Sequence, residues 1–175
     1  ENHGRPMRSI CRALTEIVDR RADTAVVFPV HYSPQVRAEV FPALSHVERI
    51  WLCDPLDYSD TAQMLKRAAL ILTDSGGLQE EAPSLGKPVL VLRNKTERME
   101  GILAGTARLV GTQTDRIVRE ACDLLSRPDL YEAMANATNP YGDGGAAKRI
   151  AEFMLYTFGR CSVKPSPFGS PVKAL

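Results

Sequence analysis

The amino-acid sequence predicts a doubly wound α/β domain built on a mostly parallel sheet. Short apolar runs alternate with amphipathic stretches along the chain at a spacing of roughly 20–25 residues, which is typical of strand–helix units. One run, P-V-L-V-L at 88–92, is apolar at every position, as in a strand covered on both faces. The 175 residues are 44% hydrophobic with a formal net charge of +1, which are ordinary values for one globular domain.

The elements expected before residue 74 follow from the spacing of apolar residues. Ile10, Leu14 and Ile17 recur at helical spacing, which predicts a helix over 7–20. The β-branched run at 24–30 predicts a buried strand. The other elements expected here are helices over 34–40 and 59–67 and strands over 49–53 and 68–73.

The second half continues the alternation. A helix should follow the third strand and bury Leu78, Ala82 and Leu85 on one stripe, with Pro83 bending it and Gly86 capping it. Beyond it we expect strands over 88–92 and 107–110 and helices over 113–125, 128–137 and 146–158. Residues 1–158 would form the domain, and the Pro- and Ser-rich stretch 159–175 a flexible tail.

Composition excludes several classes of protein. The near-zero net charge argues against a nucleic-acid partner, and no apolar run approaches the length that spans a membrane. The four cysteines form no C-x-x-C pair and only three histidines are present, so no metal site is expected. Reduced thiols fit a cytoplasmic location. No G-x-G-x-x-G fingerprint appears, and no cofactor is expected.

One segment combines the features of a phosphate-binding turn. Asp74 and Ser75 are suitable N-cap residues directly after the third strand, and Gly76 and Gly77 follow them. Backbone N–H groups of these glycines, with the Ser75 hydroxyl, could hold phosphate oxygens, and Glu81, one turn further, could accept bonds from a ribose diol. The same residues also fit a simple tight turn and cap, so the pattern alone leaves both interpretations open.

The residues around this turn resemble the non-hydrolysing UDP-N-acetylglucosamine 2-epimerase family. The resemblance rests first on T-D-S-G-G-L-Q-E-E-A-P-S-L-G-K-P at 73–88. It continues through T-E-R at 96–98, Glu100, A-G-T-A-R-L-V-G at 104–111 and N-P-Y-G-D-G at 139–144. Upstream it includes E-N at 1–2, P-V-H at 29–31 and D-P-L-D-Y at 54–58.

The resemblance implies a fold and a reaction. Family members have two Rossmann-like domains that face each other as in B-type glycosyltransferases, and this chain is similar to the second, which holds the UDP part of the substrate. The family interconverts UDP-GlcNAc and UDP-ManNAc by eliminating UDP and adding it back. Such an enzyme must hold the departing diphosphate with cationic and backbone donors.

The family's binding residues map onto positions of this sequence. Ser75, Gly76 and Gly77 match the diphosphate-binding turn, and Glu81 matches the carboxylate that binds the ribose. Arg98 matches a substrate-binding arginine, although it could also form a surface ion pair with Glu97 or Glu100.

Two further positions have weaker matches. Leu56 would offer its main chain to uracil, or simply pack. His31 matches a position that holds a second, regulatory substrate molecule, although a lone histidine is more often structural. The sequence also departs from the family: Thr61 replaces the aromatic residue that stacks on uracil, and Met99 replaces a proline.

The resemblance also implies partners. The first domain of the family supplies most catalytic carboxylates, so we expect no catalytic residue in this chain and hypothesise a fragment or split half that is inactive alone. The expected partners are UDP-GlcNAc or UDP, the N-terminal epimerase domain and, for the whole protein, a second copy in a homodimer. Two alternatives stay open: the donor-binding half of a UDP-sugar glycosyltransferase, and a non-catalytic nucleotide-sugar-binding module.

Overall fold

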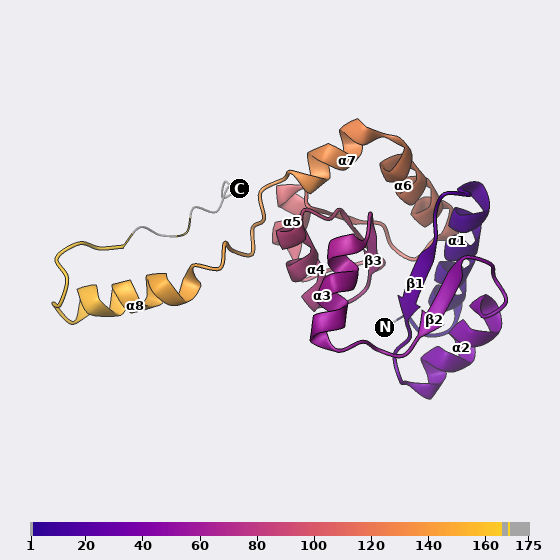
Figure 1. Cartoon of the computed structure of the whole chain (residues 1–175), viewed down its shortest axis with the longest axis horizontal. Coiled ribbons are helices and arrows are strands. Elements are labelled where there is room, and N and C mark those ends of the chain that lie inside the picture. Colours follow the sequence, from indigo (N-terminus) through magenta and orange to yellow (C-terminus); the bar gives the residue numbers. More distant parts are fainter. Residues whose placement is uncertain (1, 166–167, 169–175) are drawn as a thin grey trace.

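The computed structural model describes residues 2–165 and 168 of the chain, and strands and helices alternate along it (Figure 1). The strands are β1 Val26–Pro29, β2 Ile50–Cys53, β3 Ile71–Thr73, β4 Val89–Val91 and β5 Ala107–Leu109. The helices are α1 Arg5–Arg20, α2 Pro34–Leu44, α3 Tyr58–Arg67, α4 Gly76–Glu81, η1 Ala82–Leu85 (a 3₁₀ turn), α5 Met99–Ala104, α6 Thr114–Ser126, α7 Pro128–Ala135 and α8 Ala146–Thr157.

All strand pairs among the described residues are parallel, which confirms the predicted α/β class. They form two sheets, β1–β2 and β3–β4–β5, where the sequence predicted one. Val26 pairs with Ile50 in the first sheet, and Ile71 with Val89 in the second. Most strands are shorter than their apolar runs; the strand expected over 68–73 begins only at Ile71.

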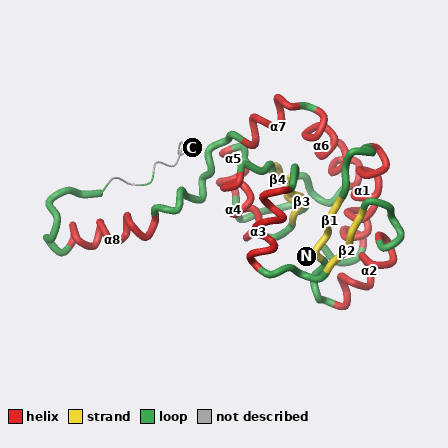
Figure 2. The backbone as a smooth tube through the Cα atoms, in the orientation of Figure 1, coloured by secondary structure: helices red, strands yellow, loops and turns green. Residues whose placement is uncertain are grey.

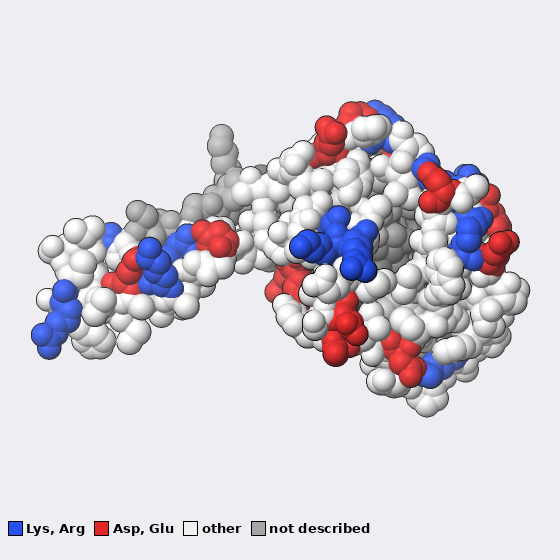
Figure 3. All heavy atoms as spheres, viewed as in Figure 1, with Lys and Arg blue, Asp and Glu red and all other residues white. Residues whose placement is uncertain are grey.

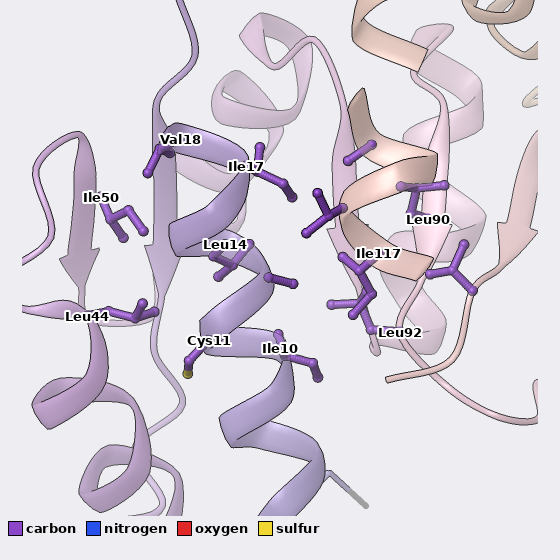
Figure 4. Close-up of a cluster of buried hydrophobic side chains, with 14 of the residues drawn as sticks. Ile10, Cys11, Leu14, Ile17, Val18, Leu44, Ile50, Leu90, Leu92 and Ile117 are labelled. Carbon is purple, nitrogen blue, oxygen red and sulfur yellow. The ribbon is translucent and has the colours of Figure 1, made fainter. Parts of the chain in front are cut away.

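Helix α1 lies between the residues that the two sheets contribute to the main core (Figure 4). Figure 4 shows Leu44 and Ile50 on one side of α1. Leu90 and Leu92 lie on its other side. The buried residues of α1 are Met7, Ile10, Cys11, Ala13, Leu14, Ile17 and Val18. One helix thus packs against both halves of the molecule.

A second apolar cluster lies around the three-stranded sheet. Ile71 and Val91 pack there with Leu65 of α3 and Ala82 of η1. The backbone turns at Gly86, whose φ of 66° is the left-handed cap that the sequence predicted. The predicted stripe of α4 is wrong at one position, because Leu85 is 39% exposed.

An arginine closes the carboxyl end of α1. Arg49, directly before β2, has a φ of 65°, which is unusual for a residue with a side chain. Its Nη1 donates to the carbonyls of Arg21 at 2.7 Å and Thr24 at 2.8 Å, and its Nη2 donates to that of Val18. The last turn of α1 leaves carbonyl groups without helical partners, and Arg49 satisfies part of them.

The last helix stands apart from the body of the molecule. Figures 1 and 2 show α8 extended away from the sheets, connected to α7 by an irregular segment. None of its residues is buried, and Ile150 and Phe153 are 61% and 50% exposed. The helix predicted over 146–158 therefore forms, but without a packing partner among the described residues. Of the expected tail, 159–175, residues 166–167 and 169–175 lie outside the described residues, and 159–165 form no helix or strand.

Candidate functional site

The glycine turn lies where β3 ends and α4 begins. Ser75 is the N-cap of α4 with extended backbone, and its own amide donates to Oγ1 of Thr73 at 3.0 Å. The Ser75 side chain makes no capping bond to the helix and is exposed. The amides of Gly76 and Gly77 belong to the first turn, where no helical carbonyl is available to them. The turn therefore presents a hydroxyl and backbone donors to solvent.

Arg98 lies directly over Gly76. A Cβ added at Gly76 would lie 2.9 Å from Cζ of Arg98 and 3.1 Å from its Nη2, which is closer than real Cβ atoms approach. Gly76 does not have a positive φ, so its lack of a Cβ matters here through the close approach of Arg98. The sequence placed both residues in the site by resemblance, and the structure brings them together.

The guanidinium of Arg98 is shared between two carboxylates. Its Nε donates to Oε1 of Glu80 at 2.8 Å, and its Nη1 pairs with Glu97. The hydrogen bond to Glu80, together with both nearby carboxylates, raises the pKa of Arg98 above its usual value. The ion pair between Arg98 and Glu97 that the sequence allowed is thus present. The second ion pair of Arg98 is formed with Glu80 and not with Glu100, which the sequence also allowed.

A buried glutamine holds the Arg98 loop against α4. Gln79 is 1% exposed, and its Nε2 donates to the carbonyl of Ser75 at 3.2 Å. Its Oε1 accepts a bond from the Thr96 hydroxyl at 2.7 Å, and Oγ1 of Thr96 accepts one from the amide of Arg98 at 3.1 Å. These bonds join the turn, α4 and the loop. Sequence reasoning gave Gln79 no role in the site. Its position four residues after Ser75 places the two residues on one face of a helix, which is a signal that could have indicated their contact.

A tyrosine from a distant segment supports the other side of the loop. The hydroxyl of Tyr141 donates to the carbonyl of Arg98 at 3.3 Å and accepts from the amide of Gly101 at 3.0 Å. A Cβ at Gly101 would lie 2.7 Å from this hydroxyl. Burial raises the pKa of Tyr141, which favours the protonated hydroxyl that this arrangement requires. Sequence reasoning quoted the 139–144 motif without giving it this role.

The carboxylate of Glu81 lies on the same side of the turn as the Ser75 hydroxyl. A Cβ at Gly77 would be 3.9 Å from both Oε1 of Glu81 and Oγ of Ser75. These are ordinary van der Waals distances, so Ser75, Gly77 and Glu81 are neighbours at the start of α4. The structure therefore gathers five of the expected site residues: Ser75, Gly76, Gly77, Glu81 and Arg98.

The side chain of Asn2 connects the start of the chain to the carboxyl ends of β3 and β4. The side chain is 6% exposed, and its Nδ2 donates to the carbonyl of Leu92 at 2.9 Å and to Oδ2 of Asp74 at 3.1 Å. The residue thus joins the carboxyl ends of β3 and β4. Sequence reasoning noted Asn2 only as part of a motif, since a contact across 72 residues leaves no local signal.

The other two expected residues follow the strands of the two-stranded sheet. His31 is exposed after β1, and its Nδ1 accepts a bond from the amide of Ser33 at 3.0 Å. Leu56 is half-buried between β2 and α3, and Thr61 is half-buried in α3. Among the described residues, no hydrogen bond or ion pair joins His31 or Leu56 to the glycine turn. Their roles stay predictions.

The arrangement suits an anionic ligand that also carries hydroxyl groups. Backbone amides, a hydroxyl and a guanidinium can hold phosphate oxygens, and a carboxylate beside them can accept bonds from a diol.

Within 2–165, no group of three His, Cys, Asp or Glu side chains could hold a metal ion. Figure 3 shows basic and acidic side chains close together at several places on one face, and a group of basic side chains alone near the middle of the body. No helix in the described part is long and apolar enough to cross a membrane.

Comparison with known proteins decides the family. The model of the UDP-N-acetylglucosamine 2-epimerase family matches residues 1–155. The chain belongs to this family. The resemblance seen in the sequence is thereby confirmed, and the named epimerases among the relatives favour it over a glycosyltransferase.

Two curated members of the epimerase family show how much of the protein the match covers. The UDP-N-acetylglucosamine 2-epimerase of Escherichia coli K12 is 52% identical over 152 residues, which are 87% of this chain and 40% of the relative. The enzyme of the same name from Bacillus subtilis is 46% identical over 168 residues, 96% of this chain and 44% of the relative. The chain thus spans less than half the length of these relatives.

Solved epimerase structures share the fold. A co-structure of S. aureus MnaA with UDP has a TM-score of 0.89 and 45% identity, covering 96% of this chain and 46% of that one. The UDP-GlcNAc 2-epimerase of Neisseria meningitidis, solved with UDP-GlcNAc bound, has a TM-score of 0.83 and 44% identity, with 88% and 42% covered. The expected Rossmann-like half of a glycosyltransferase-B-like fold is confirmed.

Proposed function

We propose that this chain is the UDP-binding part of an epimerase that interconverts UDP-GlcNAc and UDP-ManNAc by eliminating UDP and adding it back. The observation that carries the proposal is the glycine turn beneath Arg98 with Glu81 beside it. The printed names of the relatives, and the UDP and UDP-GlcNAc in two related structures, support this ligand class. The four free cysteines favour a reducing compartment such as the cytoplasm.

Each gathered residue has a role in this proposal. The amides of Gly76 and Gly77 and the hydroxyl of Ser75 donate to the diphosphate, and Arg98 adds a charged donor. Glu81 accepts bonds from the ribose hydroxyls. In addition, Leu56 offers its main chain to uracil and, as a separate proposal, His31 contacts a second substrate molecule.

The ion pairs of Arg98 leave part of its guanidinium available to a ligand. Glu80 accepts from Nε, and Glu97 pairs with Nη1. Nη2, which would lie 3.1 Å from a Cβ at Gly76, takes part in neither of these ion pairs and has two N–H groups to donate. On this proposal a diphosphate over the turn binds Nη2 while both ion pairs stay in place.

We propose that the remaining parts of the longer protein supply what this chain does not. The gathered residues are donors and one diol acceptor, and none is placed to move the proton at C2 of the sugar. The acid and base groups would come from the N-terminal epimerase domain, and a whole protein would act as a homodimer. On this proposal the chain alone binds UDP and does not turn over UDP-GlcNAc.

Calorimetric titration with UDP tests the binding role. The parent chain should bind, and the Ser75→Ala/Glu81→Ala variant should lose at least tenfold in affinity, because hydrogen bonds to charged groups contribute about 1.5–3 kcal/mol each. The matched control, Ser45→Ala/Glu48→Ala, removes an exposed pair at the end of α2 and should bind like the parent. Equal affinity of all three proteins, or no binding by the parent, would contradict the proposal.

A further inference from the structure

The segment between α7 and α8 contacts the candidate site before it leaves the body of the molecule. Figure 1 shows this segment passing beside α5 and then leading into α8. In the described part of the chain, the hydrogen bonds that join residues 139–157 to the body are both made by the Tyr141 hydroxyl. Since α8 itself buries no residue, Tyr141 is the hydrogen-bonded link between α8 and the site.

The Tyr141 hydroxyl takes the place of a capping side chain at the start of α5. Arg98 is the N-cap residue of α5, and its side chain makes no capping bond. The amide of Gly101 lies in the first turn, where no helical carbonyl is available to it, and donates to the Tyr141 hydroxyl at 3.0 Å. The same hydroxyl donates to the Arg98 carbonyl at 3.3 Å. One hydroxyl thus fixes the backbone of the residue whose guanidinium lies over Gly76.

Asn139 closes the turn that carries Tyr141. Its Oδ1 accepts from the Tyr141 amide at 3.1 Å, and its Nδ2 donates to the Gly142 carbonyl at 3.3 Å. Bonds of this kind, from an asparagine to the backbone two or three residues further on, stabilise tight turns. The turn therefore holds Tyr141 in a fixed position relative to the residues that follow Gly142.

Asp143 joins this turn to the start of α8. Its Oδ1 accepts from Nη1 of Arg149 at 2.8 Å, and its Oδ2 accepts from Nη2 at 2.6 Å. Oδ1 also accepts from the amide of Gly145 at 2.9 Å. The hydrogen bonds from Arg149 and then from Gly145 lower the pKa of Asp143, so its carboxylate is charged at neutral pH. Two parallel bonds between a guanidinium and a carboxylate fix orientation as well as distance.

These contacts form one continuous path from α8 to the glycine turn. The path runs from Arg149 to Asp143, through the turn to Tyr141, and from its hydroxyl to the backbone of Arg98. Coupling between separate parts of a protein is carried by such hydrogen bonds and ion pairs. A change at the α8 end of the path should therefore reach Arg98.

We propose that Tyr141 is a positioning residue for Arg98 and that Asp143 and Arg149 couple the start of α8 to it, so that this path sets how well the site binds a diphosphate. The inference rests on the proposed function, in which Arg98 is a donor to the diphosphate. Without the path, the bond from its amide to Thr96 remains to hold the Arg98 backbone. The loop would then place the guanidinium over the glycine turn for a smaller fraction of the time.

Calorimetric titration with UDP tests the positioning role. Tyr141→Phe removes the hydroxyl, keeps the ring and should weaken UDP binding about three- to tenfold. In an Arg98→Ala background the same change should have no further effect, because the hydroxyl acts through Arg98. The matched control is Tyr131→Phe, which removes a hydroxyl that donates to the carbonyl of Ala69 at 2.9 Å, before β3 and at its far end from the glycine turn. This control should bind UDP like the parent.

A second variant tests the part played by α8. Arg149→Met removes the ion pair with Asp143 but keeps a long side chain, and it should weaken UDP binding about two- to threefold. Combined with Tyr141→Phe it should add no further loss, because both changes break the same path. Lys148→Met is the matched control, since it removes the neighbouring cation of α8, whose side chain is 81% exposed. It should bind UDP like the parent.

Amide hydrogen exchange at Gly101 detects the same path without any nucleotide. This amide donates to the Tyr141 hydroxyl, so Tyr141→Phe should speed its exchange about tenfold and Arg149→Met about threefold. The amide of Asp60 is the internal reference, because it too lies in the first turn of a helix and donates to a side chain, the carboxylate of Asp57, at 2.8 Å. Its exchange should be equal in all variants.

Three results would overturn the inference. Unchanged exchange at Gly101 in Arg149→Met would show that α8 is not coupled to the loop. Unchanged UDP affinity in Tyr141→Phe, or an equal loss with and without Arg98, would show that the hydroxyl does not position the guanidinium. A parent chain that binds no UDP would instead contradict the proposed function, and the exchange rates at Gly101 would still decide whether the path exists.

Discussion

Helices α1 and α8 are both amphipathic, yet only α1 is packed. α1 buries seven residues between the two sheets, whereas α8 buries none and leaves Ile150 61% exposed. The apolar spacing in the sequence predicts both helices equally well. The comparison teaches that helical periodicity identifies a face that needs a partner but does not say where the partner lies.

The related structures bear on the packing partner that α8 lacks among the described residues. The S. aureus MnaA match covers 96% of this chain, and the remaining 4% of 175 residues is about seven, fewer than the 12 residues of α8. At least part of α8 therefore aligns, with a TM-score of 0.89, in a protein of about twice the length. We expect the apolar face of α8 to lie against the additional chain of such a longer protein.

Replacing isoleucine by alanine in each helix should give the largest difference. Ile17→Ala in α1 removes a side chain that is 3% exposed and should lower the free energy of unfolding by about 2–5 kcal/mol. Ile150→Ala in α8 makes the same chemical change at an exposed site and should stay within about 0.5 kcal/mol of the parent. Urea unfolding measures both. Similar losses in the two variants would mean that α8 packs on the body in solution.

The carboxyl end of α1 should be the next most sensitive point. Arg49→Ala removes three hydrogen bonds to carbonyls and should cost about 1–3 kcal/mol in the free energy of unfolding. Arg49→Gly removes the same bonds but suits the φ of 65°, so it should be about 1 kcal/mol less damaging. Thermal and urea unfolding distinguish the two. If glycine costs as much as alanine, the backbone at this position is not constrained as described.

The cysteines extend the comparison to ionisation. Burial raises the pKa of the Cys11 thiol in α1 from about 9 to about 11. Between these values the unfolded chain loses the proton and the folded chain keeps it, so stability should fall as the pH rises from about 9 to about 11. Cys11→Ala should show a shallower decline over the same range, measured by urea unfolding. Parallel profiles for the two proteins would contradict this assignment.

The rates of thiol labelling at two cysteines test the same difference in packing, with the smallest expected effect. Cys161, which follows α8, is exposed, whereas Cys11 is 2% exposed. A thiol reagent at pH 8 should modify Cys161 at least tenfold faster, because reaction needs an accessible thiolate. Peptide mass spectrometry gives both rates. Comparable rates in the native protein would indicate that α1 opens far more readily than its packing suggests.

Much of the fold follows from sequence because it depends on local pattern. The apolar runs and periodic faces predicted all five strands described and most of the helices, with boundaries off by a few residues, but they missed α5 Met99–Ala104. The division into two sheets was not predictable, since apolar runs do not specify which strand pairs with which. Leu85 was placed wrongly because the chain changes from α-helix to a 3₁₀ turn at Ala82, which shifts the buried face.

For the candidate site, the sequence named residues but not their contacts. Resemblance named Arg98 and the glycines, and the structure places Arg98 beside Gly76. The bonds through Gln79, Thr96 and Tyr141 join segments far apart in the chain. Such contacts depend on the tertiary fold, and no spacing rule predicts them.

The approach of Arg98 to Gly76 has an evolutionary consequence. An alanine at position 76 would meet only the flexible end of the arginine, so it would push the cation aside at little cost in folding. On the proposed role of Arg98, a larger residue at position 76 would weaken diphosphate binding rather than stability. The same proposal implies that descendants of this sequence should keep glycine at position 76 for as long as they keep arginine at position 98.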